Sequence, residues 1–255
     1  MESKGKRTRT YTTASIILRA ASYLEKDRLL VLFSRDHGKL SAIAKGARGP
    51  KSRLAAASQL FAHGQFHFAK GRSLDILTQA RVHDSFPNIR KDISLTTACA
   101  QACELVMKTM ADGQSDPRIF DDLLSYLTLA DRGMDAVLFW CGFQSRMLTH
   151  LGQLPELSIC VACGNPTDEI SLLFSLERGG IMCTSCETNG KGLQIHQRTA
   201  RALQQMADVE PFLVNHLSLS PQIQTEAINL LEQFIKRHLD IQLKSSRVLS
   251  QLHDS

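Results

Sequence analysis

The sequence has no long apolar run, and tryptophan occurs in it only once. No segment approaches the roughly 18 apolar residues that a helix needs to cross a bilayer. The basic segment from Met1 to Thr10 is followed by a short apolar stretch that contains Arg19, unlike the apolar region of a secretory signal. We therefore expect a cytoplasmic protein without a membrane partner. The seven cysteines, an odd number, fit a reducing compartment.

Catalytic signatures are also missing. The chain has no glycine-rich phosphate loop followed by Lys and Ser or Thr, no pair of acids at a useful spacing, and no Ser/His/Asp arrangement. These absences predict a protein that is not an enzyme. An enzyme that processes nucleic acid remains the alternative, and a nuclease assay in magnesium or manganese would separate the two.

The charge is divided unevenly along the chain. The formal net charge is +5, yet residues 1–81 carry 16 Lys and Arg against 5 Asp and Glu, and the rest carries 14 against 20. A basic part joined to an acidic part indicates a polyanion-binding half and a half that supports the fold or docks proteins. The alternative is a solvated surface with uneven charge.

Residues 11–84 have the pattern of a small β-barrel domain. Apolar and alternating runs predict five short strands, and Asp36-His37-Gly38 predicts a hairpin turn between the second and third. Five strands in about 70 residues favour a closed barrel, because closure removes exposed strand edges. An OB-fold fits the count and size, and an SH3-like barrel stays open. The predicted strands are residues 15–20, 28–34, 39–44, 65–69 and 73–82.

A basic loop follows the third predicted strand. It holds the four cations Lys45, Arg48, Lys51 and Arg53 within nine residues, together with Gly and Pro, which prevent continuation of the strand. Glycine lets a backbone approach a ligand, and Lys and Arg neutralise phosphates. The loop therefore predicts contact with a nucleic-acid backbone. Three aromatic residues of the same domain fit either base stacking or a barrel core: Phe61, Phe66 and Phe68.

From residue 85 onward the apolar period becomes helical. Apolar stripes predict helices over 92–110, from Asp116-Pro117 to Leu127, and over 134–151, 197–206 and 221–243. The stripes fit core faces and do not suggest a cofactor site. The fold class predicted for the whole chain is α+β, with a flexible basic N-terminus (1–10), an OB-fold domain (11–84) and a helical domain (85–255).

Four cysteines interrupt the helical domain. They form the pairs Cys160-Val-Ala-Cys163 and Cys183-Thr-Ser-Cys186, separated by 19 residues. Two Cys-x-x-Cys pairs at this separation predict one tetrahedral Zn²⁺ site, and a zinc with four protein ligands has a structural role because no coordination position stays open. The expected unit is a zinc-ribbon-like insertion at 158–190. A metal-free loop or a redox-active pair is the alternative.

The other three cysteines lie on predicted helices. Cys99 and Cys103 are four residues apart, and Cys141 lies in another apolar helix. A pair at this spacing could bind a metal, but buried thiols that pack as small apolar groups are the preferred interpretation.

The order of these parts resembles the bacterial RecO family of recombination mediators over nearly the whole chain. The segments that carry the resemblance are Arg28 to Leu40, Ala44 to Arg48, Gly71 to Thr78, and the cysteine quartet from Cys160 to Cys186. The resemblance rests on the order and spacing of these segments rather than on any single one of them.

The resemblance implies an N-terminal OB-fold that binds single- and double-stranded DNA and anneals complementary strands. It also implies work with RecR and RecF to load RecA onto strands coated by single-strand-binding protein, and contact with the acidic C-terminal tail of that protein. Such a protein lies in the bacterial cytoplasm near the nucleoid. An RNA-binding zinc-ribbon module stays as an alternative. The DNA-binding residues carried over are Lys39, Lys45, Arg48, Lys51, Arg53 and Arg72.

Overall fold

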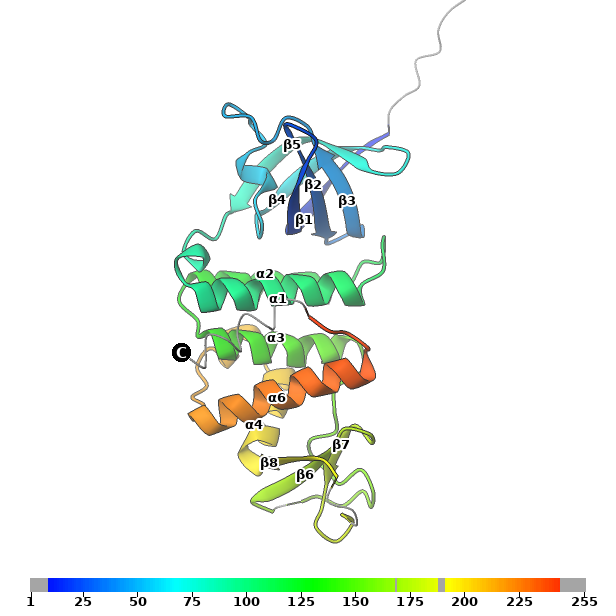
Figure 1. The fold of residues 1–255 in the computed structure, drawn as a ribbon, viewed down its shortest axis with the longest axis vertical. Coiled ribbons are helices and arrows are strands. Elements are labelled where there is room, and N and C mark those ends of the chain that lie inside the picture. Colours follow the sequence, from blue (N-terminus) through cyan, green and yellow to red (C-terminus); the bar gives the residue numbers. More distant parts are fainter. Residues whose placement is uncertain (1–8, 168, 188–190, 244–255) are drawn as a thin grey trace, which may run out of the picture. The chain divides into compact units, whose positions relative to one another are not determined.

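The computed structural model describes residues 9–167, 169–187 and 191–243 (Figure 1). The chain divides into two compact units. The first contains residues 1–87 and 106–127, and the second contains residues 88–105 and 128–255. Most of the predicted flexible N-terminus and positions 168 and 188–190 of the predicted insertion lie outside the described residues. Within the described part, no helix has the length and apolar character required to span a bilayer.

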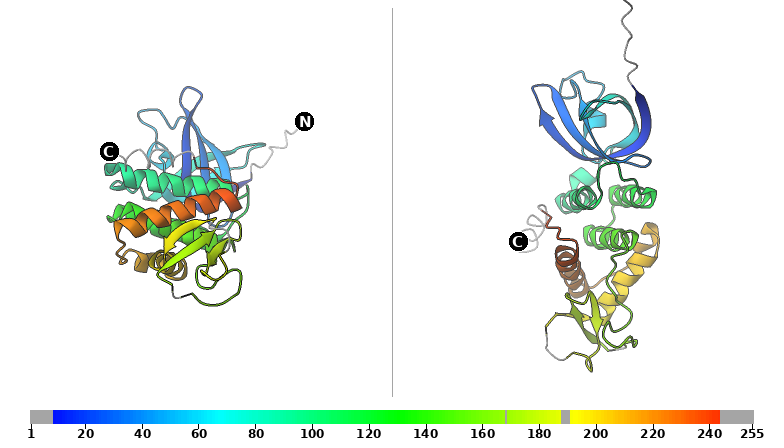
Figure 2. Two further views of the ribbon diagram at one scale, coloured as in Figure 1. Left: turned by 60° about the horizontal axis from the view of Figure 1, so that its bottom comes forward. Right: turned by 90° about the vertical axis from the view of Figure 1, so that its right-hand side faces the viewer.

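Five strands close into a barrel, which confirms the predicted OB-like fold. They are β1 (Thr10–Tyr23), β2 (Asp27–Ser34), β3 (Gly38–Ala44), β4 (His63–Ala69) and β5 (Asp75–Asp84). Their order around the barrel is β1-β2-β3-β5-β4, and the parallel pairing of β3 with β5 completes the ring. Figure 2 shows from two further sides how the strands surround a common interior.

The barrel closes because β1 is long enough to pair with two neighbours. Its first half pairs with β4 and its second half with β2, and the register shifts between Ile17 and Arg19. A bulge of this kind bends a strand. Alternate side chains of each strand point inward. The enclosed core consists largely of fully buried residues, among them Ile17, Leu30, Leu32, Ala42, Phe66, Phe68 and Leu77.

The turn between β2 and β3 contacts residues 106–127 of the same unit. These residues belong to the end of α1 (Ile93–Thr109), the connection after it, and α2 (Pro117–Asp131). Gly38 has a φ of 67°, and a Cβ at this position would collide with the carbonyl group of Gln114. Arg35 forms an ion pair with Asp121 at 2.9 Å. This end of the barrel is therefore covered and charge-compensated.

The second unit combines helices with a small sheet. It contains α3 (Ala136–His150), α4 (Gln197–Asp208), α5 (Pro211–Val214) and α6 (Pro221–His238), and the strands β6 (Ser171–Ser175), β7 (Gly180–Met182) and β8 (Leu193–His196). Asp135 caps α3 by accepting hydrogen bonds from the backbone N–H groups of Val137 and Leu138 at 2.9 and 3.0 Å. The sheet has the order β7-β6-β8, and β8 packs against α4 and α6 (Figures 1 and 2).

Two details of the second unit differ from the prediction. The last helix ends at His238 rather than at Leu243, and Asp240, just beyond its end, has a φ of 53°, a left-handed conformation that stops a helix. The short elements β8 and α5 were not predicted, because four residues are too few to show a reliable period.

Candidate nucleic-acid interface and metal centre

The four cysteines of the insertion converge on one point. The sulfur atoms of Cys160, Cys163, Cys183 and Cys186 all lie within 4.8 Å of one another. Cys163 Sγ and Cys183 Sγ are 3.9 Å apart. Four thiolates around a zinc ion, at a Zn–S distance of about 2.3 Å, are separated by about 3.8 Å. The cluster can therefore hold a metal ion, and its donor set and size fit zinc.

Tight turns present these sulfur atoms. In the first pair, the backbone N–H of Ala162 donates to Cys160 Sγ at 3.4 Å, and Gly164 closes the turn with a φ of 75°. In the second pair, the N–H groups of Cys186 and Glu187 both donate to the Cys183 carbonyl oxygen at 3.1 Å. Backbone geometry that brings two thiolates of each pair together is local, so the sequence spacing predicted it correctly.

The sheet joins the two turns. Val161 N–H donates to the Ile181 carbonyl oxygen at 2.9 Å, which ties the first cysteine turn to β7. Strand β7 then leads directly into Cys183. Cys160 is fully buried, whereas Cys163 is exposed. With four sulfur ligands the cluster leaves no position for water or substrate, so it can organise this part of the chain but cannot activate a reactant.

The remaining cysteines are buried, as expected. Cys99 and Cys141 are completely buried, and Cys103 is 1% exposed. Burial raises the pKa of Cys103 to about 12, and burial followed by the charges of Asp135 and Glu232 raises the pKa of Cys141 to about 12. These thiols stay protonated at neutral pH and are inert packing groups.

The basic loop leaves the barrel next to the β1–β2 turn. Strand β2 pairs Asp27 with Tyr23 on one side and Arg28 with Ala44 on the other, so both connections lie at one end of the barrel. The loop backbone is a succession of tight turns in which Gly49 donates to the Gly46 carbonyl oxygen at 3.0 Å, and Ser52 donates to that of Gly49 at 3.0 Å. The loop is therefore ordered, although its four cationic side chains are exposed.

The four predicted cations of this loop are exposed. Arg48 donates from Nη1 to the Glu25 carbonyl oxygen at 3.2 Å. Among the described residues, Lys45, Lys51 and Arg53 form no ion pair or hydrogen bond with another side chain. Positive charge that no acid compensates is available to an external anion such as a phosphate.

The two other predicted DNA-binding residues lie elsewhere on the barrel. Lys39 donates from Nζ to the Met107 carbonyl oxygen at 2.8 Å and lies 3.3 Å from the Asp112 carboxylate. Its side chain is 18% exposed, and its charge is largely neutralised by these contacts within the first unit. Arg72 is exposed in the connection between β4 and β5. The structure thus groups four of the six predicted residues on one loop.

The aromatic residues considered for base stacking belong to the core. Phe66 and Phe68 are completely buried and Phe61 is 1% exposed, so none presents a ring face to a base. Of the two alternatives, the barrel core is thus the correct one, and for Phe66 and Phe68 the reason is the strand period: alternate residues of β4 point into the closed barrel. Tyr23, at the end of β1, is 37% exposed, and the sequence analysis did not single it out.

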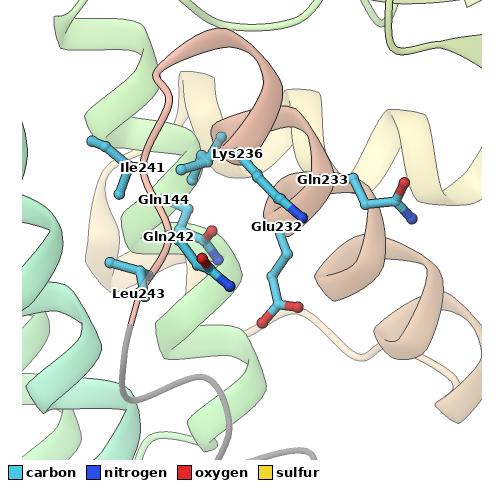
Figure 3. Close-up of a pocket in the computed structure, with 8 residues that line it drawn as sticks. Gln144, Glu232, Gln233, Lys236, Ile241, Gln242 and Leu243 are labelled. Atoms are coloured by element: carbon cyan, nitrogen blue, oxygen red, sulfur yellow. The ribbon is translucent and has the colours of Figure 1, made fainter.

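A separate pocket lies in the second unit (Figure 3). It has a volume of about 250 Å³ and is formed by α3, α6 and the residues after α6. Its charged residues are Glu232 and Lys236, whose charges offset each other. The pocket therefore lacks the positive charge that a polyanion site requires.

Comparison with known proteins agrees with this layout. The family description "Recombination protein O N terminal" matches residues 8–86, and "Recombination protein O C terminal" matches residues 90–247. A protein named DNA repair protein RecO from Desulfitobacterium hafniense is 33% identical over 239 residues, covering 92% of this chain and 87% of the relative. Proteins of the same name from Desulforamulus reducens and Symbiobacterium thermophilum are each 30% identical and cover 96% of this chain and 96% and 98% of their own.

Proposed function

The chain belongs to the RecO family of DNA repair proteins, and from this premise we propose that it is a non-catalytic mediator of recombination. It binds single-stranded DNA, anneals complementary strands, and helps to load RecA onto strands coated by single-strand-binding protein. Double-stranded DNA is a second ligand. The protein acts in the bacterial cytoplasm near the nucleoid.

The observation that carries the proposal is the uncompensated charge of the loop after β3. Lys45, Lys51 and Arg53 are exposed and have no acidic partner among the described residues. Each cation that neutralises a phosphate releases a condensed counterion, so binding is favourable at low salt and weakens steeply as salt rises. Contacts of this kind act on the backbone and carry no sequence information.

Annealing follows from the same charges. Two complementary strands repel each other through their phosphates, and a basic surface that neutralises part of both lets them approach. Holding both strands on one protein also raises their local concentration, which speeds pairing without any bond-making step. Arg72, exposed in the β4–β5 connection, is a further phosphate contact in this proposal. Lys39 contributes less, because Met107 and Asp112 already engage its ammonium group.

The cysteine cluster contributes stability in this proposal. One Zn²⁺ bound by Cys160, Cys163, Cys183 and Cys186 links the two cysteine turns around β6 and β7. The four sulfur atoms would supply all ligands of the ion, which would cross-link the two turns. The DNA-binding surface of the barrel needs no metal.

The remaining partners follow from the family. We assign RecR, the acidic tail of single-strand-binding protein and RecF as protein partners, and RecA as an indirect one. Residues 82–255 carry 14 Lys and Arg against 20 Asp and Glu, a net negative charge that disfavours nucleic acid and the acidic tail alike and supports docking of the other protein partners on this part.

The test measures binding and annealing with the same samples. Fluorescence anisotropy with a single-stranded oligonucleotide gives the affinity, and the quenching of two labelled complementary strands gives the annealing rate. We expect Lys45→Glu together with Arg48→Glu to weaken both while the zinc content stays at one ion per chain. Unchanged affinity at low and moderate salt would refute the proposal, and tighter binding to a matched RNA would favour an RNA-binding module.

A further inference from the structure

Two apolar side chains project into solvent from the turn between β1 and β2. Tyr23 is 37% exposed and Leu24 is 72% exposed. The other large apolar residues exposed in the described part of the chain all belong to the second unit: Ile93, Ile159, Ile170, Phe212 and Leu213. On the described barrel, exposed apolar surface from large side chains is thus confined to this one turn.

The backbone of this turn is held in an uncommon conformation. Leu24 has a φ of 48°, a left-handed region that bulky residues rarely occupy. Phe61 and Phe86 also have positive φ values, 69° and 49°, but their rings are 1% and 4% exposed, so packing offsets the strain. Leu24 gains little packing in return. Because little packing within the fold offsets the backbone strain at Leu24, we infer that this residue is placed to contact a ligand.

Hydrogen bonds attach this turn to the basic loop. Gly46 N–H donates to Asp27 Oδ1 at 2.7 Å, and Arg48 N–H donates to the Lys26 carbonyl oxygen at 2.9 Å. The guanidinium of Arg48 donates to the Glu25 carbonyl oxygen at 3.2 Å. Apolar side chains and phosphate-binding cations therefore belong to one ordered surface at one end of the barrel.

We propose that Tyr23 and Leu24 form a contact site for the unpaired bases of single-stranded DNA. The Tyr23 ring stacks on one base and Leu24 packs against its neighbour, while the basic loop holds the adjoining phosphates. Stacking on an aromatic ring accepts any base, because every base has a π face. This inference rests on the proposed function. It adds a reason for the protein to distinguish single strands, whose base faces are open, from duplexes.

The occupant follows from the surroundings of the turn. A single strand carries apolar base faces and anionic phosphates in regular alternation. This surface offers apolar groups next to the cations Lys45, Lys51 and Arg53, and its acids are Glu25 and Asp27, of which Asp27 already accepts a hydrogen bond from Gly46. A protein partner would need apolar groups flanked by acids. Binding of such a partner instead of DNA is one outcome of the test.

The test compares two oligonucleotides with the same number of phosphates. One is an oligothymidylate, and in the other several central nucleotides lack their bases. Wild-type protein is expected to bind the oligothymidylate more tightly. Tyr23→Ala should weaken oligothymidylate binding by about 5- to 100-fold, the range for the loss of one stacked base, and leave the abasic oligonucleotide unaffected. Tyr23→Phe keeps the ring and should behave as wild type.

Phe212→Ala provides the matched control, because this aromatic residue is 63% exposed in the second unit. It should leave both affinities unchanged. Circular dichroism on heating confirms that Tyr23→Ala is folded. Equal affinity of the Tyr23→Ala and wild-type proteins for oligothymidylate would overturn the inference, and so would an equal loss on both oligonucleotides.

Failure of the inference and failure of the proposed function look different. If wild-type protein binds both oligonucleotides equally, and Lys45→Glu with Arg48→Glu weakens both, phosphate binding stands and the base contact is refuted. If wild-type protein binds neither oligonucleotide at low salt, the proposed function itself fails.

Discussion

The cysteine cluster and the basic loop are both groups of four like side chains on short connections, yet their functional groups are arranged in opposite ways. The four sulfur atoms lie within 4.8 Å of one another. The cations of the loop face solvent, and three of them have no partner among the described residues. Sulfur atoms that converge can bind one shared metal ion. Cations that point into solvent can be neutralised only by an anion of another molecule.

This difference in arrangement distinguishes a structural site, the cysteine cluster, from a binding site, the basic loop. The sulfur cluster belongs to the second unit and has no coordination position left for a substrate. The basic loop belongs to the first unit, where the opposite end of the barrel uses its cations in ion pairs with Asp112 and Asp121. Within the described part of the barrel, the loop cations Lys45, Lys51 and Arg53 thus lack an acidic partner, whereas Lys39 and Arg35 at the opposite end are paired.

The largest expected effect comes from breaking the convergent cluster. Cys183→Ser removes one metal ligand, and zinc binding supplies about 10–16 kcal/mol in isolated zinc-finger peptides. We expect loss of stoichiometric zinc and rapid proteolysis within residues 158–187, with the oligonucleotide affinity of the barrel retained. Metal analysis measures the zinc content, and limited proteolysis measures the cleavage of the insertion.

Cys99→Ala is the control for that variant, because Cys99 is fully buried outside the cluster. The Cys99→Ala protein should keep one zinc per chain, and its insertion should resist proteolysis as in the wild type. A Cys183→Ser protein with full zinc content would show that the cluster is not the metal site.

A smaller effect separates the two ends of the barrel. Lys39→Met removes a charged hydrogen bond to the Met107 carbonyl oxygen and an ion pair with Asp112. Urea denaturation should show a free energy of unfolding lower by about 1–2 kcal/mol, with oligonucleotide affinity nearly unchanged. Lys45→Met should instead weaken oligonucleotide binding and leave the free energy of unfolding nearly unchanged. If Lys39→Met weakened DNA binding as much as Lys45→Met, the contrast between paired and unpaired cations would be wrong.

The smallest effect concerns the strained turn. Leu24→Gly removes the cost of a left-handed leucine, about 1–3 kcal/mol, but adds a glycine entropy cost of about 0.5–1 kcal/mol. We expect a net gain in the free energy of unfolding of about 1 kcal/mol, measured by urea denaturation, together with weaker oligothymidylate binding. A loss of stability would show that Leu24 packs usefully within the barrel.

Local patterns predicted much of this structure. Alternation and turn residues located four barrel strands to within two residues, but only residues 15–20 of β1 (Thr10–Tyr23). The two Cys-x-x-Cys spacings located the cysteine cluster, because the geometry of each pair depends on neighbours in the chain. The alternation of the Phe residues in β4 also has the strand period, and it places them in the core, the alternative to base stacking that the sequence left open.

Features that depend on distant contacts could not be predicted. The partners of Lys39 lie about 70 residues away, at Met107 and Asp112, so its sequence neighbourhood resembles that of a free cation. The exposure of Tyr23 depends on where the barrel closes, and its sequence neighbours look like an ordinary strand end. The sequence therefore identified the cations as a group but did not show that Lys39 is already engaged by other residues of the protein.

The central claim is that the uncompensated cations of the loop bind phosphates, and a salt series tests it most directly. The affinity for oligothymidylate is measured at increasing salt for wild type and for Lys45→Glu/Lys51→Glu/Arg53→Glu. A variant with the same charge change in the second unit, Arg132→Glu/Arg178→Glu/Lys236→Glu, is the control. The slope of log affinity against log salt should become shallower by about 2 for the loop variant and stay unchanged for the control. Equal slopes for all three proteins would contradict the account.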